Sequence, residues 1–421
     1  MGDEKQRVWA YIDEHRPRWL ALVREVIRRP SDNPPGETLQ LADYIQGVLT
    51  EAGLPVRRFD PLPGAVNLVS SIGTWGGRHL VLNGHLDTFP VEDPERWVHD
   101  PYSGDVFDGM IYGRGAGDMK GGTTALLSAF LTIAALKVPL RGRLTLMLVS
   151  DEETGGRWGT QWLLEEHPDL LGDAVLSAEP STPQAINISE KGVCWIRVRT
   201  LAEGGHGGLG KISSHENAIV KMARVLEIAR GLAGRRGLLP DQIAPLLDSS
   251  RAFLEQQPYG RGHSWVLDAL SLNIGRIHGG VKINVVPVSC DAELDYRMPP
   301  GFTAAQVHDL FRQALQEAGL EDVHSEVWMT AEPSYTSPDA EIVRLTQANA
   351  EAVTGSCPRL QMAYGGTDCR FFRYRGVSAA IYGPRVYNMG APNEMITVDD
   401  FFTVLKVHAG TILEYLGAGD S

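Results

Sequence analysis

The chain of 421 residues has few cysteines, no long apolar run and no excess of positive charge. Its four cysteines are widely spaced and form no Cys-x-x-Cys pair, which argues against a disulfide framework and a cysteine zinc site. No stretch approaches the roughly 20 apolar residues that span a bilayer, and residues 1–18 have no signal-peptide core. The net charge of −13 disfavours nucleic acid and anionic membranes as main partners. These absences predict a cytoplasmic protein with reduced thiols and without a membrane or nucleic-acid partner.

The composition that remains is that of a globular protein, with 43% hydrophobic and 22% charged residues. In the first half, apolar runs typical of buried strands alternate with stretches of helical spacing. The strand-like runs are 80–84, 144–150 and 174–178, and the helical stretches are 19–27, 39–52 and 119–136. This alternation predicts an α/β catalytic domain, with a mostly parallel sheet and helices on both faces.

The middle of the chain has a different pattern, in which strands look half-exposed. The alternating segments are 192–200, 270–276 and 290–297, and the helical ones are 216–232 and 303–318. We expect an inserted α+β domain here, acting as a lid or a dimerisation domain, with a long irregular segment at 230–263. The predicted organisation is a catalytic domain formed by residues 1–190 and 331–421, interrupted by a lid or dimerisation domain at 191–330.

Acidic residues and one histidine follow the predicted strands of the first half. They are His85 and Asp87 after the first strand, Glu152 and Glu153 after the second, Glu179 after the third, and Asp118 in a glycine-rich turn before a helix. Because sites in open α/β sheets form beyond the carboxyl ends of the strands, we expect these side chains at one edge. One imidazole with several carboxylates is a suitable shell for a divalent metal.

The spacing of these residues adds two details. Asp87 lies two residues after His85, so in strand geometry its carboxylate can accept the second imidazole N–H and fix the metal-binding tautomer. Glu152 and Glu153 are adjacent, so one can bind metal while the other activates a water molecule. The alternatives are that His85-Leu86-Asp87 only caps a strand and that Glu152-Glu153 is a solvated acidic loop.

Four segments of the chain, in order, resemble a known metallopeptidase family. They are Leu82-Asn83-Gly84-His85-Leu86-Asp87-Thr88, Gly113-Arg114-Gly115-Ala116-Gly117-Asp118-Met119-Lys120-Gly121-Gly122, Asp151-Glu152-Glu153-Thr154-Gly155-Gly156 and Ala178-Glu179-Pro180. The family includes aminoacylase, carboxypeptidase G and succinyl-diaminopimelate desuccinylase, and the resemblance extends over nearly the whole chain. It implies a catalytic domain interrupted by a lid domain, and a homodimer formed through that lid.

The resemblance also implies a role for each candidate residue. Asp118 would bridge two metals. The first metal would also bind His85 and Glu179. The second would also bind Glu153 and a histidine near the C-terminus. Glu152 would be the general base and Asp87 the partner of His85. His206 of the lid would polarise the scissile carbonyl, often from the other subunit. The residues expected to bind the substrate are Asn284, Arg297, Gly366 and Arg370.

The pattern breaks at the last metal ligand. The family has the motif His-Ala-Pro-Asn-Glu, where this chain reads Gly390-Ala391-Pro392-Asn393-Glu394, and the only histidine after His324 is His408, in a helical pattern. Three outcomes are open: the first site works alone, the second survives weakly on Glu153, Asp118 and water or Asn388, or the protein is a non-catalytic binding relative. We favour the first, because the other residues of the site are present.

The altered ligand set bears on the metal and on the reaction. One histidine among carboxylates is a harder set than that of a standard zinc site, which shifts the expectation toward Mn²⁺, with Zn²⁺ or Co²⁺ as alternatives. We expect one tightly bound ion and a second site that is weak or absent. The expected reaction is hydrolysis of a C–N bond in a small carboxylate-bearing substrate, an N-acyl amino acid or a peptide-like amide. The alternative activity is that of an aminohydrolase acting on an aromatic amine such as a nitroanthranilate, since the resemblance also covers such an enzyme.

Overall fold

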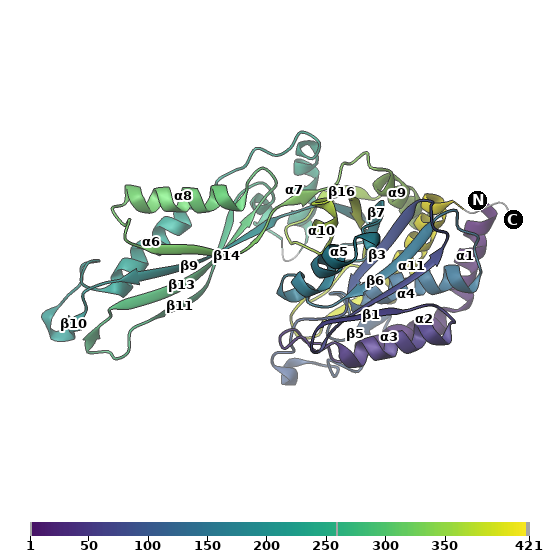
Figure 1. The fold of residues 1–421 in the computed structure, drawn as a ribbon, viewed down its shortest axis with the longest axis horizontal. Coiled ribbons are helices and arrows are strands. Elements are labelled where there is room, and N and C mark those ends of the chain that lie inside the picture. The colour runs from purple at the N-terminus through teal and green to yellow at the C-terminus, as the bar shows by residue number, and fades with distance from the viewer. Residues whose placement is uncertain (1, 258–259, 418–421) are drawn as a thin grey trace. The chain divides into compact units, whose positions relative to one another are not determined.

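The computed structural model describes residues 2–257 and 260–417. The chain forms two compact units (Figure 1). The first unit comprises Met1–Ile188, Thr336–Leu360 and Thr367–Ser421, and the second, the insert unit, comprises Ser189–Tyr335 and Gln361–Gly366. The chain therefore leaves the first unit and returns to it. The short segment Gln361–Gly366 was expected in the catalytic domain, but its contacts group it with the insert unit.

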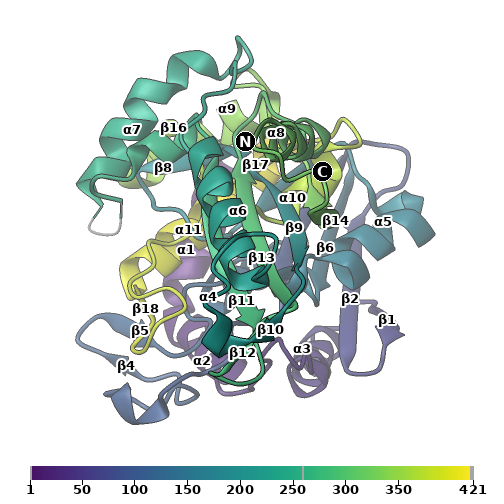
Figure 2. The same cartoon turned by 90° about the vertical axis from the view of Figure 1, so that its left-hand side faces the viewer.

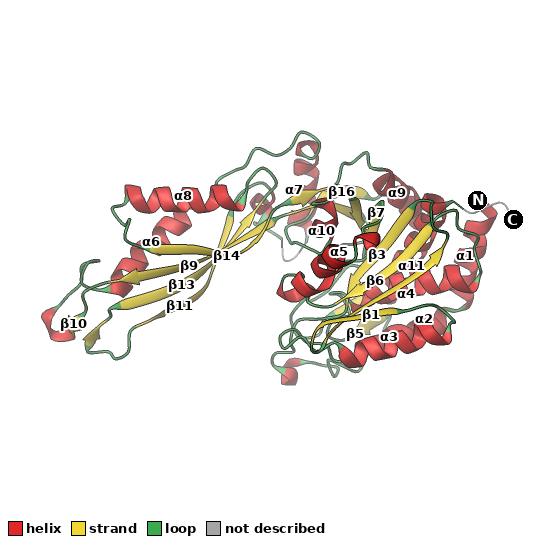
Figure 3. Cartoon of the chain, viewed as in Figure 1, coloured by secondary structure: helices red, strands yellow, loops and turns green. Residues whose placement is uncertain are grey.

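The first unit is built on a nine-stranded mixed sheet, of which strand β15 and the ends of β8 and β16 are grouped with the insert unit (Figure 3). The strands run in the order β1-β2-β6-β3-β7-β17-β8-β15, and β16 pairs with β8. Their bounds are β1 Arg57–Leu62, β2 Ala65–Gly73, β3 His79–His85, β6 Arg143–Val149, β7 Ala174–Ser177, β8 Ala185–Glu190, β15 Ser334–Tyr335, β16 Arg359–Met362 and β17 Ser378–Ile381. The central strands β6, β3, β7 and β17 are parallel, whereas β1 and β2 pair antiparallel with their neighbours and β8 pairs antiparallel with β17 and β15. The sheet is thus parallel only at its centre, which is where the candidate site residues follow its strands.

Helices cover both faces of this sheet, as the sequence predicts. Their bounds are α1 Gly2–Glu14, α2 Arg16–Ile27, α3 Leu39–Glu51, α4 Lys120–Ala135, α5 Trp162–Glu166, α9 Glu341–Thr354, α10 Cys369–Arg373 and α11 Val398–Leu416. On one face, Val81 and Val149 pack in a core with Leu163 of α5 and Phe372 of α10. On the other, Gly84 lies against α4. Both faces of β3 and β6 are therefore buried, which explains why these strands read as continuous apolar runs.

A small three-stranded sheet completes the first unit. It consists of β4 Val106–Phe107, β5 Met110–Tyr112 and β18 Met395–Thr397, with β5 in the middle. Along the chain, β5 comes just before the glycine-rich turn that contains Asp118, and β18 comes just after the loop that contains Gly390. None of the helices among the described residues is both long and apolar enough to cross a membrane.

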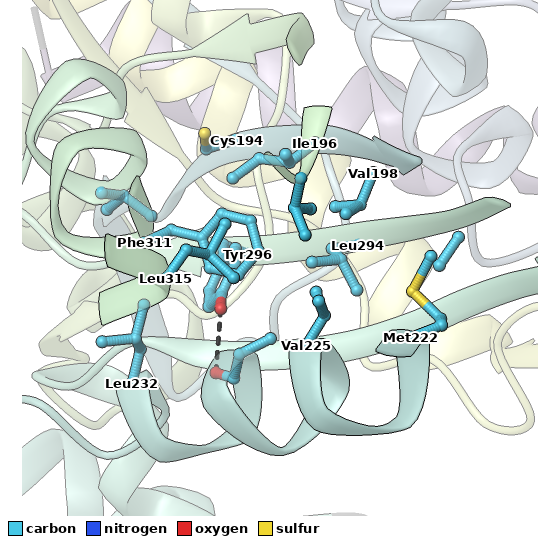
Figure 4. Packing of buried hydrophobic residues seen from close by; sticks show 14 of the residues in the cluster. Cys194, Ile196, Val198, Met222, Val225, Leu232, Leu294, Tyr296, Phe311 and Leu315 are labelled. Carbon is cyan, nitrogen blue, oxygen red and sulfur yellow. Dashed lines mark hydrogen bonds between the residues drawn. The ribbon is translucent and has the colours of Figure 1, made fainter. Parts of the chain in front are cut away.

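The insert unit has an antiparallel four-stranded sheet in the order β11-β13-β9-β14. Helices α6 and α8 cover one face of this sheet (Figures 1 and 2). The bounds are β9 Gly192–Leu201, α6 Ala218–Leu232, β11 Ser271–Gly279, β13 Ser289–Met298, α8 Ala304–Glu317 and β14 His324–Ala331, with the short pair β10 Gly205–His206 and β12 Val285–Val286 beside them. Alternate residues of β9 and β13 enter the core, where the Tyr296 hydroxyl donates to the carbonyl of Ala229 at 2.8 Å (Figure 4).

One expectation for the insert unit is wrong. The segment 230–263 is not irregular throughout, because helix α7 occupies Leu247–Gln256. Phe253 and Leu254 are the apolar residues that this helix buries, along with Ser250. The Ser250 hydroxyl accepts a hydrogen bond from the backbone N–H of Met362 at 3.1 Å, which attaches α7 to the segment Gln361–Gly366. This helix has few apolar positions, and the segment around it is rich in Gly, Pro and Arg. The apolar periodicity that would predict a helix is therefore weak.

Candidate metal centre and active site

The structure brings three of the candidate residues to one corner of the first unit. His85 ends β3, Glu179 follows β7 beside it, and Asp118 precedes α4. His85 Nε2 lies 3.2 Å from Asp118 Oδ1 and 3.8 Å from Glu179 Oε2. Ligand atoms of all three lie within 4.8 Å of one another, and no other such group of three is found in the described residues. The carboxyl ends of neighbouring parallel strands thus meet as the sequence pattern predicts.

The N-terminal end of α4 packs closely against the strand ends. The Thr123 hydroxyl donates to the carbonyl of His85 at 2.8 Å. A Cβ on Gly122 would lie 2.0 Å from the carbonyl oxygen of Ala178, so only glycine permits this approach. The glycines after Lys120 therefore have a packing role, which holds the turn of Asp118 beside Glu179.

The imidazole of His85 has the tautomer that a metal requires, but its partner differs from the expectation. His85 Nδ1 lies 2.8 Å from the backbone carbonyl of Asp87, whereas the Asp87 carboxylate is 3.6 Å away. Because a carbonyl can only accept, Nδ1 holds a proton, which leaves Nε2 as the nitrogen that would bind a metal beside Asp118 and Glu179. Strand β3 ends at His85, so the strand geometry assumed for the carboxylate does not extend to Asp87.

The carboxylate of Asp87 instead organises the loop that follows β6. It is fully buried and accepts hydrogen bonds from the backbone N–H groups of Glu152 at 3.3 Å and Glu153 at 3.1 Å. Asn33 donates to the same carboxylate at 2.9 Å and to the Thr154 hydroxyl at 3.0 Å. Sequence reasoning missed Asn33, since an Asn-Pro-Pro run predicts a turn but not its distant partner.

Glu152 is half-buried beside Arg370. An Arg370 guanidinium nitrogen lies 3.4 Å from Glu152 Oε1, and the same guanidinium donates to the carbonyls of Thr367 at 2.7 Å and Gly155 at 2.9 Å. Burial raises the pKa of Glu152 to about 8, while the charges of His85 and Arg370 oppose that rise. A carboxyl group with this pKa can take up and release a proton near neutral pH, as a general base must.

The donor set fits a bound cation. Burial raises the pKa values of Glu179 and Glu153 well above the ordinary value, and in both residues the charge of Asp118 adds to the shift. Burial lowers the pKa of His85, but Glu179, Asp118 and Asp87 together raise it well above its usual value. Glu153 Oε1 is buried and accepts no hydrogen bond from any described residue. A divalent metal would offset the negative charge that gathers on these acids around one imidazole.

The loop that contains Gly390 is exposed at this residue, which stands where the family motif has its histidine. Gly390 is exposed and has φ 71°, a left-handed conformation that favours glycine. Among the residues that the structure describes, a Cβ at this position would contact Phe89 alone, at 3.6 Å. Asn388 donates to the carbonyl of Asn393 at 3.1 Å, so its amide is engaged within the loop. The helical histidine His408 is fully buried and lies 2.7 Å from the carbonyl of Tyr382, inside the core.

The expected lid residues lie in the insert unit. His206 in β10 pairs with Val285 in β12, and the N–H of Gly207 donates to the carbonyl of Asn284 at 3.0 Å, so His206 and Asn284 are close neighbours. Both are exposed. Arg297 of β13 donates from Nε to Asp295 at 2.9 Å. Gly366 ends the segment Gln361–Gly366, in which the carbonyl of Gly365 accepts from the N–H of Lys191 at 3.3 Å.

Comparison with known proteins agrees with this geometry. Residues 81–414 match the model of peptidase family M20/M25/M40. The succinyl-diaminopimelate desuccinylase of Methylorubrum extorquens is 30% identical over 377 residues, which cover 86% of this chain and 89% of that protein.

Solved structures share the fold. A metallo-carboxypeptidase of the M20 family from Sulfolobus solfataricus superposes with a TM-score of 0.79 at 20% identity, covering 94% of this chain and 98% of its own. A Bacillus subtilis protein described as a dinuclear metal-binding peptidase of the M20 family has a TM-score of 0.66 at 13% identity, covering 97% and 100%. The chain belongs to peptidase family M20/M25/M40 and is a metal-dependent hydrolase that acts on C–N bonds.

Proposed function

We propose that the chain hydrolyses the amide bond of a small carboxylate-bearing substrate, an N-acyl amino acid or a peptide-like amide, at one metal ion. The ion would be held by His85, Asp118 and Glu179. The observation that supports this proposal best is the group formed by these three side chains, of which His85 and Glu179 are buried and Asp118 is half-buried, with the carboxyl group of Glu152 close by. A divalent cation in such a place supplies Lewis-acid chemistry, polarising a carbonyl and acidifying water.

Glu152 is the proposed general base. It accepts a proton from the attacking water and later gives that proton to the leaving nitrogen. Arg370 faces Glu152 and donates to two backbone carbonyls. We therefore assign it to positioning the base, whereas the sequence led us to expect that it binds substrate. Asp87 positions the same base through the backbone N–H groups of Glu152 and Glu153.

One metal is proposed rather than two, because the loop at Gly390 offers no imidazole. Glu153 and Asp118 then retain only carboxylates for a second ion, which we expect to bind weakly. The ligand set of one histidine and carboxylates favours Mn²⁺, with Zn²⁺ and Co²⁺ as alternatives.

The insert unit is proposed to bind the substrate and to form a homodimer. His206 would polarise the scissile carbonyl, and Asn284, Arg297 and Gly366 would hold the substrate. The exposure of His206 and Asn284 in the separate unit supports this assignment, since both are available to a ligand. Analytical ultracentrifugation of the full chain checks the dimer: a monomer at every concentration would contradict it.

The test of the function uses Glu152→Gln beside Glu166→Gln, a change of an exposed residue in α5. Each variant is loaded with Mn²⁺ and assayed with a panel of N-acyl amino acids and dipeptides. We expect Glu152→Gln to keep its metal and lose about 10²- to 10⁴-fold in kcat, and Glu166→Gln to keep both. Equal kcat in the two variants would reject Glu152 as the base. Ammonia release from aromatic amines, without turnover of any amide, would reject the amide substrate in favour of the aminohydrolase reaction.

A further inference from the structure

The Gly390 loop is joined to the turn of Asp118 by a buried ion pair. Glu394 is completely buried and Arg114 is 1% exposed. Their side chains meet at 2.5 Å, between Arg114 Nη1 and Glu394 Oε2. Neither residue belongs to the group of candidate ligands, and an ion pair buried so completely is retained at a desolvation cost.

The second oxygen of Glu394 is aimed at the metal-ligand turn. Oε1 accepts from the backbone N–H of Gly117 at 2.9 Å and from that of Asp118 at 3.0 Å. The backbone carbonyl of Glu394 also accepts from the N–H of Gly113 at 3.0 Å. The turn is thus fixed at both ends by one residue, immediately where the Asp118 side chain leaves the backbone.

Arg114 extends the same connection to the loop itself. Its Nη2 donates to the carbonyl of Gly390 at 3.0 Å and lies 3.4 Å from the carbonyl of Pro90. The backbone carbonyl of Gly390 is therefore hydrogen-bonded to a side chain of the turn that contains Asp118.

We propose that Glu394 is a positioning residue for the metal centre, which sets the direction of the Asp118 carboxylate by accepting the N–H groups of Gly117 and Asp118. Arg114 holds Glu394 in place and neutralises its charge. The Gly390 loop thereby serves the centre without supplying a ligand. This inference rests on the proposed metal site of His85, Asp118 and Glu179.

The proposal separates the acceptor role of Glu394 from the ion pair. Arg114→Met with Glu394→Gln removes both charges and keeps an amide oxygen for the two N–H groups. Arg114→Met with Glu394→Leu removes the charges and the acceptor, and replaces the buried pair with apolar side chains, an exchange that often leaves stability unchanged or increased. Arg143→Met is the matched control, because Arg143 is 6% exposed and lies at the opposite end of β6 from Glu152.

The measurement is Mn²⁺ affinity of metal-free full-length protein, read from the free-ion electron paramagnetic resonance signal, with thermal unfolding recorded alongside. We expect the Gln double variant and Arg143→Met to bind Mn²⁺ within about threefold of wild type. We expect the Leu double variant to lose about 10- to 100-fold, the range for loss of a group that orients a ligand. Wild-type affinity in a folded Leu double variant, or equal losses in the two double variants, would overturn the positioning role. Failure of the wild-type chain to bind Mn²⁺ would instead reject the metal site itself.

A second measurement needs no variant to fold. Hydrogen exchange of the metal-free wild-type chain, resolved to Gly117 and Asp118, reports directly on the two N–H groups that Glu394 accepts. We expect both amides to be protected as strongly as those within α4. Exchange as fast as in the exposed loop at Gly390 would overturn the proposal.

Discussion

The His85 side and the Gly390 side of the candidate metal centre differ in burial and in the groups that they present. His85 and Glu179 are buried at the ends of adjacent parallel strands, and Asp118 is fixed at the start of α4. The loop of Gly390 is exposed and has no ligating side chain at that position, although Glu394 at its end is completely buried. The comparison shows that a ligand on a surface loop can be absent while the sheet and helix still assemble the other half of a centre. The buried residue of the loop keeps its connection to that half.

The largest expected effect is on Mn²⁺ affinity, and it distinguishes the carboxylate of Asp118 from that of Glu153. We expect Asp118→Asn to weaken Mn²⁺ binding by more than about 100-fold, beyond the range for residues that only orient a ligand. Glu153→Gln, in contrast, should weaken the first equivalent by less than about tenfold, because Glu153 lies outside the group formed by His85, Asp118 and Glu179. Calorimetric titration with Mn²⁺ measures both. Similar losses of Mn²⁺ affinity in the two variants would mean that Glu153 also binds the tight ion, which would contradict the site of His85, Asp118 and Glu179.

The next effect concerns the residue that joins His85 to the base. Asp87→Asn keeps the size of the side chain but replaces one accepting oxygen with an amide, so an N–H of Glu152 or Glu153 loses its partner. We expect a loss of about 10- to 100-fold in kcat or Mn²⁺ affinity. Steady-state kinetics and metal titration check this, with Asp108→Asn on the exposed turn between β4 and β5 as control. Activity equal to that of the control would contradict the role of Asp87.

The pH dependence of metal binding follows from the pKa directions on the His85 side. The pKa of His85 is raised well above its usual value by its carboxylates, and burial raises that of Glu152 to about 8. Below these values the metal-free site holds protons that an incoming ion must displace. Apparent affinity should therefore rise as pH increases from 6 to 8, by up to about tenfold per pH unit for each proton released. Calorimetry in buffers of different ionisation enthalpy counts those protons, and affinity independent of pH would contradict this account.

The smallest effect is expected on the Gly390 side. Gly390→His returns an imidazole to the loop, with Gly390→Ala as the matched control. Both substitutions place a side chain at φ 71° and should lower the unfolding free energy by about 1 kcal/mol. Only the histidine variant should gain a second bound ion, detected by metal analysis and denaturant unfolding. If neither variant gains an ion, the missing imidazole is not what limits the second site.

The sequence predicts the His85 side better than its surroundings, for physical reasons. Fully buried strands such as β3 and β6 give continuous apolar runs, and the polar residues after them converge because parallel strands end together. The hydrogen-bond partners of these polar residues cannot be predicted in the same way, because they come from residues far apart in the chain. Asn33 beside Asp87 and Glu394 beside Asp118 leave no periodic signal.

The expectations for Arg370 and for residues 230–263 illustrate the same limit. A resemblance suggests that Arg370 binds substrate, but the neighbouring Glu152 is visible only once α10 and the loop after β6 are placed together. Helix α7 buries few apolar residues, so its pattern is weak in the sequence. Patterns that repeat along one element can be read from a chain, whereas contacts between elements cannot.

The number of metal ions needed for activity tests the central claim most directly. Metal-free protein is titrated with Mn²⁺ while bound metal and amide hydrolysis are followed in the same samples. We predict that activity reaches its maximum at one bound ion for each chain, and that further metal adds little. Activity that is absent at one equivalent and appears only when two ions are bound to each chain would contradict a centre that works without the Gly390 side.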